Sequence, residues 1–100
     1  MEDYGLKSVR ERWHILFSGK VQHVGFRYTA FYIARELYLT GWVDNLPDGS
    51  VVMEVQGEVS RIRKLILKLR GSPHIRITKM EIQKMEVDPR SARFEVRGYD

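Results

Sequence analysis

The chain has 100 residues, 43% of them hydrophobic and 11% aromatic, which suits one compact domain with a single core. It contains no cysteine, so disulfides, thiolate nucleophiles and cysteine-ligated metals are excluded and the fold depends on packing. The formal net charge of +4 favours anionic partners such as phosphorylated metabolites or nucleic acid.

The N-terminal segment MEDYGLKSVRER carries charges of both signs and shows no sustained apolar period. It lacks the apolar stretch of a secretory signal, and no run of eighteen apolar residues occurs in the chain. We therefore expect a cytoplasmic protein without membrane contact, with residues 1–12 as a flexible tail and residues 13–100 as the folded domain.

The first predicted strand begins at Trp13, because apolar and more polar residues alternate from there to Ser18 and Gly19 ends the pattern. One face of this strand should be strongly apolar and the other partly buried. A helix is predicted from Phe26, with apolar residues at helical spacing and a stop before Gly41. This helix is expected to cover one face of the sheet.

Two short strands follow, GWVDN (41–45) and SVVMEVQG (50–57). Between them lie Pro47, Asp48 and Gly49, three residues that favour tight turns. The segment is therefore predicted to form a β-hairpin.

The last third of the chain predicts a second helix and two further strands. Apolar residues recur at helical spacing from Val59 to Leu69 with basic residues between them, until Gly71 breaks the pattern. Alternation over residues 78–83 predicts a strand, and FEVRGY (94–99) predicts a short final one.

The order strand, helix, strand, strand, helix, strand, with one added short strand, is typical of the ferredoxin-like split βαβ fold. We expect an α+β sandwich, with an antiparallel sheet and both helices on one face. If the first and third strands are central, the first and second strands run in the same direction. Their C-terminal ends then meet at one edge of the sheet, where the functional site is expected.

Two groups converge at that edge, the segment GKVQHVGFR (19–27) and Asn45. Two inter-strand spacings place their backbones roughly 10 Å apart, a gap that Arg27 and Asn45 can bridge with a small anion between them. The loop adds unpaired N–H groups at a helix N-terminus, which suit a phosphate. No Lys-Ser or Lys-Thr pair follows Gly25, so this is not a nucleotide P-loop.

With these motifs, the chain resembles the acylphosphatase family from about residue 13 to 99. The family pattern reads GxVQGVxFR after the first strand, GWVxN on the second strand and a DG turn before the third. The corresponding segments here are GKVQHVGFR, GWVDN and PDG, in the same order. Two separated motifs in the correct order are much more specific than either alone.

The resemblance implies an enzyme that hydrolyses small acyl phosphates, such as acetyl phosphate, without metal or cofactor. It implies that Arg27 binds the substrate phosphate and that Asn45 positions the attacking water. The implied partner is the small substrate, with no nucleic acid or membrane, and a monomer is expected. The substrate-binding loop would comprise Lys20, Val21, Gln22, His23, Val24, Gly25 and Phe26. Within that loop, Val24 is expected to fill core and Gln22 to bond backbone.

His23 departs from the family pattern, which has glycine at this position. A glycine there suggests a positive φ or a close approach to the anion. Histidine can adopt left-handed geometry at a cost of roughly 1 to 2 kcal/mol. A protonated His23 would add positive charge beside the anion, so we hypothesise that phosphate affinity changes between pH 5 and pH 8.

Other readings of these residues stay open. Arg27 could be a solvated helix residue, Asn45 could only form a turn, and Trp42 is expected to pack rather than to stack on substrate. The chain could also be a phosphate-binding or regulatory ferredoxin-like domain whose catalysis has lapsed through His23. An RNA-binding module is disfavoured because the central strands lack the aromatic signature of that class.

Overall fold

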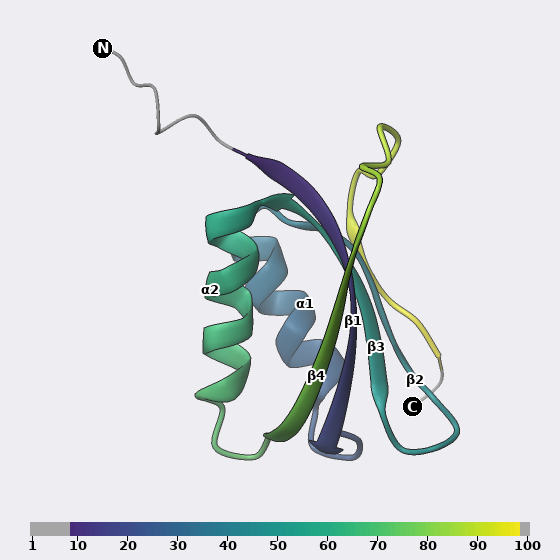
Figure 1. The fold of residues 1–100 in the computed structure, drawn as a ribbon. Coiled ribbons are helices and arrows are strands. Elements are labelled where there is room, and N and C mark those ends of the chain that lie inside the picture. The colour runs from purple at the N-terminus through teal and green to yellow at the C-terminus, as the bar shows by residue number, and fades with distance from the viewer. Residues whose placement is uncertain (1–8, 99–100) are drawn as a thin grey trace.

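The structure is a computed structural model that describes residues 9–98. Within these residues the elements are β1 (Arg10–Lys20), α1 (Phe26–Glu36), β2 (Thr40–Asn45), β3 (Val51–Glu58), α2 (Val59–Arg70), β4 (Arg76–Met85) and β5 (Phe94–Val96). The strands form one sheet in the order β4-β1-β3-β2-β5, and both helices cover the same face (Figure 1). This arrangement confirms the predicted ferredoxin-like α+β fold.

The sheet is antiparallel except at one edge. β3 pairs antiparallel with both β1 and β2, so β1 and β2 run in the same direction and end at the same edge, as predicted. β5 pairs parallel with β2, which makes the sheet mixed, whereas an antiparallel sheet was expected. The parallel pair adds a short strand outside β2 and carries the chain back toward the edge where the loop before α1 lies (Figure 1).

β1 begins at Arg10, before the predicted start at Trp13, so residues 10–12 belong to the sheet and not to a tail. The reason is Arg12, which is buried and donates hydrogen bonds to Glu54, Gln56 and Ser91. A buried arginine that is satisfied by side chains from distant strands leaves no apolar signal in the sequence. Residues 1–8 of the expected tail lie outside the described residues.

The core lies between the sheet and the two helices. Fully buried side chains come from β1, α1, β2, β3, α2 and the loop before α1, and they include Ile15, Phe17, Phe26, Met53, Ile62, Leu65 and Leu69. The rings of Phe17, near the end of β1, and Phe26, the first residue of α1, lie 5.0 Å apart between centroids. This contact fixes the start of α1 against the end of β1, and therefore fixes both ends of the loop between them.

Among residues 9–98, neither helix is long and apolar enough to cross a membrane.

Candidate active site

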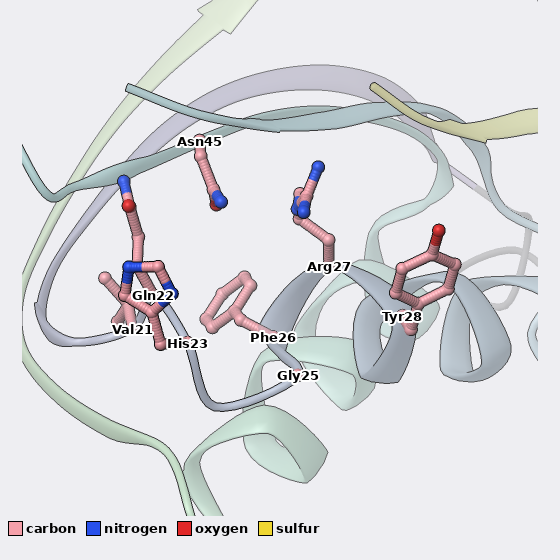
Figure 2. Close-up of a pocket in the computed structure, with 8 residues that line it drawn as sticks. All are labelled: Val21, Gln22, His23, Gly25, Phe26, Arg27, Tyr28 and Asn45. Atoms are coloured by element: carbon pink, nitrogen blue, oxygen red, sulfur yellow. The ribbon is translucent and has the colours of Figure 1, made fainter. Parts of the chain in front are cut away.

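A small cavity of about 100 Å³ lies where the loop between β1 and α1 meets the end of β2. Figure 2 shows the side chains of Arg27, from the first turn of α1, and Asn45, from β2, directed into the same space. The cavity is lined by Val21, Gln22, His23, Gly25, Phe26, Arg27, Tyr28 and Asn45. Two residues that are far apart in the sequence therefore share one cavity, and no acidic side chain lines it.

The loop backbone is left-handed at two points. His23 has φ 62°, which confirms the positive φ expected at this position. Gly25 has φ 78° and ψ 18° and is the N-cap of α1, without a side-chain cap. No acidic residue lies in the first turn of α1, so the positive end of the helix dipole faces the cavity without a carboxylate to neutralise it.

The N–H groups of this loop have few partners within the protein. Among residues 9–98, the N–H groups of residues 22–25 donate to no other residue. Unpaired N–H groups beside a helix N-terminus form a concave donor set that suits an anion with several oxygens.

Arg27 is only 7% exposed, although it carries a charge. Its Nη1 donates to the backbone carbonyl of Arg97, just after β5. Gly98 lies against the same nitrogen, since a Cβ atom there would lie 3.0 Å from Arg27 Nη1. The C-terminal segment after β5 therefore holds the guanidinium in place from the side opposite to the loop.

Asn45 ends β2, and the hairpin turn after it is closed without its side chain. The Asp48 carboxylate accepts hydrogen bonds from the N–H and the hydroxyl of Ser50, at 2.9 and 2.6 Å. The N–H of Leu46 donates to the carbonyl of Ser50 at 2.9 Å. No described residue bonds the Asn45 carboxamide, so it is available to a molecule in the cavity.

Gln22 connects the loop to that hairpin turn. Its Nε2 donates to the carbonyl oxygens of Leu46 and Ser50, both at 2.8 Å. This confirms the prediction that Gln22 bonds backbone. These bonds hold the loop that precedes Arg27 against the hairpin turn that follows Asn45.

The remaining predicted loop residues divide into two groups. Val21 and Phe26 belong to the core and also form the floor of the cavity. Val24 packs against the core, as predicted, while Lys20 and Val24 lie outside this cavity and line a neighbouring one with His23.

Sequence reasoning did not identify two contributors to the site, Tyr28 and the backbone of Arg97. Tyr28 is 56% exposed and lines the cavity from the first turn of α1. The position of Tyr28 directly after Arg27 was the sequence feature that could have indicated its place in the cavity. The Arg97 carbonyl gave no signal, because a backbone acceptor has no residue type. The Arg97 side chain stacks on Trp42 at 4.3 Å from the ring centroid, so Trp42 packs against the protein, as expected.

The residues of this cavity offer nitrogen donors and amide groups rather than a carboxylate-rich or histidine-rich set. Within the described part of the chain, no group of three or more His, Asp or Glu side chains is placed to hold a metal ion. The arrangement suits an oxyanion, with a bidentate guanidinium on one side, N–H groups below and a carboxamide opposite.

Comparison with known proteins identifies a family with matching sequence and fold. The sequence model of the acylphosphatase family matches residues 13–96. The chain is 45% identical over 84 residues to an acylphosphatase of Clostridium perfringens, and this match covers 83% of the chain and 94% of the relative.

Two solved structures share the fold and have the same family name. The structure of an acylphosphatase from Coxiella burnetii superposes with a TM-score of 0.80 at 35% identity, covering 88% of this chain and 93% of that one. The crystal structure of acylphosphatase from Bacillus subtilis gives a TM-score of 0.81 at 27% identity, covering 88% and 99%.

Proposed function

Because the chain belongs to the acylphosphatase family and hydrolyses the carboxyl-phosphate bond of small acyl phosphates, we propose that Arg27, Asn45 and the N–H groups of the loop carry the reaction. The observation that carries this proposal is the single cavity that Arg27 and Asn45 line together.

Arg27 binds the phosphoryl group of the substrate. A guanidinium offers two parallel N–H donors to two phosphate oxygens, which fixes orientation as well as charge. Burial of Arg27 and its bond to the Arg97 carbonyl support this role, because a held side chain loses little freedom when substrate binds.

The N–H groups of residues 22–25 stabilise negative charge on the phosphoryl oxygens in the transition state. They are fixed before substrate arrives, since the loop is held by Gln22 and by the core residues at both its ends. Donors that need no reorganisation during the reaction are effective catalysts.

Asn45 orients the attacking water from the other side of the cavity. The water oxygen forms a bond to phosphorus as the bond between phosphorus and the acyl oxygen breaks, and the carboxylate leaves with that electron pair. The protons of the water pass to phosphate oxygens and solvent. We infer that no side-chain base is needed, because the phosphoryl group of the substrate accepts the first proton.

We also propose that the enzyme acts as a cytoplasmic monomer without a metal, cofactor, nucleic-acid or membrane partner. Support comes from the small acyl-phosphate substrate that the family implies. Analytical ultracentrifugation of the full chain tests the monomer, and activity in EDTA tests the independence from metal.

Phosphate release from benzoyl phosphate in the presence of EDTA tests the role of Arg27. We expect Arg27→Ala to lower kcat/KM at least about a hundredfold, as the loss of an oxyanion donor does. Arg27→Lys should also be poor, because a point charge cannot replace the planar fork. Arg35→Ala, an exposed arginine in the last turn of the same helix, is the matched control and should stay active. Normal turnover by Arg27→Ala would refute the proposal.

A further inference from the structure

A second cavity of about 340 Å³ lies beside the first and shares His23 as a common wall. We call it the basic cavity. It is formed by the end of β1, the loop before α1 and the segment from α2 into β4, and is lined by Lys20, His23, Val24, Pro73, His74, Ile75 and Arg76. Its polar lining consists of two permanent cations and two imidazoles.

Among the described residues, no acidic side chain lies in the lining of the basic cavity to neutralise its two cations. Within residues 9–98, Lys20 and Arg76 form no ion pair, and no Asp or Glu lines the cavity. Elsewhere on the sheet, by contrast, Arg12 pairs with Glu54 at 3.0 Å and Lys84 with Glu11 at 3.2 Å. The positive charge of the cavity is therefore not neutralised by the described part of the protein.

A bulge in the sheet brings these two cations together. β1 and β4 pair with Ser18 opposite Lys79, but Gly19 pairs with Ile77 and Lys20 with Arg76, so Thr78 is skipped. Without the shift, Lys20 would face Ile77. Bulges of this kind redirect side chains and are frequent beside functional sites.

The bulge depends on a glycine. A Cβ atom on Gly19 would lie 2.2 Å from the carbonyl oxygen of Arg76, and Gly19 has φ 126°. Like charges directly opposite each other on neighbouring strands destabilise a sheet. The chain thus adopts a specialised backbone that keeps two cations side by side, an arrangement that an anion between them would stabilise.

We propose that the basic cavity binds an anionic group on the acyl portion of the substrate, so that the enzyme prefers acyl phosphates whose acyl group carries its own anionic oxygens. This inference rests on the proposed function, because it requires the phosphoryl group in the first cavity. The acyl group then passes His23, the wall that the two cavities share. Lys20 and Arg76 contact the distal anion, and His74 lies on the same rim.

The test compares kcat/KM for benzoyl phosphate with kcat/KM for 3- and 4-carboxybenzoyl phosphate, which differ from it by one carboxylate. The measured quantity is kcat/KM for the charged substrate divided by kcat/KM for the neutral one. The intrinsic reactivity of the two substrates cancels when this ratio is compared between variants and wild type. We expect Arg76→Gln to lower this ratio about five- to tenfold for at least one isomer. Arg76→Lys should keep most of the wild-type ratio, because it retains the positive charge.

Three further measurements accompany this comparison, and the first of them separates a local site from the overall charge of the protein. Arg90→Gln removes one exposed arginine from the turn before β5, at the other end of the sheet, and should leave the ratio unchanged (Figure 1). Lys20→Gln provides an independent variant should Arg76→Gln fail to fold, and should lower the ratio in the same direction. Raising the salt concentration should lower the wild-type ratio, because the cavity is open to solvent.

An unchanged ratio in both Arg76→Gln and Lys20→Gln would overturn the inference, as would an equal fall in Arg90→Gln. Neither result would affect the proposed function, which the loss of benzoyl phosphate hydrolysis in Arg27→Ala tests on its own.

Discussion

His23 shows how a single backbone angle can shape the site. It has φ 62° in the loop that faces the cavity, a conformation that costs an L-residue free energy but costs glycine little. The side chain that accompanies this angle lines both cavities. The protein therefore keeps an imidazole between the two cavities at some expense in stability.

Replacing His23 with glycine should raise the free energy of unfolding by about 0.5 to 1 kcal/mol, because relief of left-handed strain exceeds the added entropy of the unfolded chain. Urea denaturation measures this change. His23→Ala is the matched control, since it removes the imidazole but keeps the strain, and it should give no gain. A loss of stability in His23→Gly would show that the contacts of the imidazole contribute more to stability than the left-handed strain costs.

The residues of the site differ in how clearly the sequence predicts their position. The placement of Arg27, Asn45 and Gln22 could be predicted because their motifs specify both residue type and position relative to predicted elements. The Arg97 carbonyl that holds Arg27, and the buried Arg12, could not. Both depend on contacts between segments whose pairing only the folded sheet establishes.

At the level of elements, Gln22 joins the loop before α1 to the hairpin turn between β2 and β3. Gln22→Glu keeps the shape of the side chain but removes both donated hydrogen bonds and places a carboxylate against two carbonyl oxygens. We expect the free energy of unfolding to fall by about 2 kcal/mol and KM for benzoyl phosphate to rise, since the loop loses its anchor. The same change at exposed Gln83 on β4 is the control and should alter neither quantity. A stable Gln22→Glu with normal KM would contradict the anchoring role.

Strands β1 and β3 are also linked by charge on the face away from the helices. Burial raises the pKa of Glu54, but hydrogen bonds from His14 and Arg12 lower it more, so the net shift is below the ordinary value for glutamate. A carboxylate with a lowered folded-state pKa stabilises the protein above its unfolded pKa. That contribution is lost as the pH falls through the folded pKa.

Glu54→Gln should therefore lower the free energy of unfolding by about 1 kcal/mol at pH 7, and by progressively less as the pH falls and the wild-type carboxyl takes up its proton. Denaturation curves from pH 7 to pH 3 measure the difference. Glu81→Gln removes a more exposed carboxylate, which pairs with Lys79 at the surface, and serves as the control. A pH-independent effect at Glu54 would show that its charge does not stabilise the sheet.

For the whole molecule, element order was enough to predict the split βαβ topology and the edge at which β1 and β2 end. Strand periodicity also gave the faces of β1 correctly, with Ile15 and Phe17 in the core. The parallel pairing of β5 could not be predicted, because three residues carry too little pattern to choose a neighbour or a direction. β5 nevertheless matters to the site, since the segment after it holds Arg27.

The fold brings Arg27 and Asn45 to one cavity, where we propose that the arginine binds phosphate and the asparagine positions the water. The most direct test measures kcat for benzoyl phosphate and the inhibition constant for inorganic phosphate in Asn45→Ala, with circular dichroism to verify folding. We predict that kcat falls at least about a hundredfold while the inhibition constant stays within about threefold of wild type. Normal turnover by a folded Asn45→Ala would contradict the account.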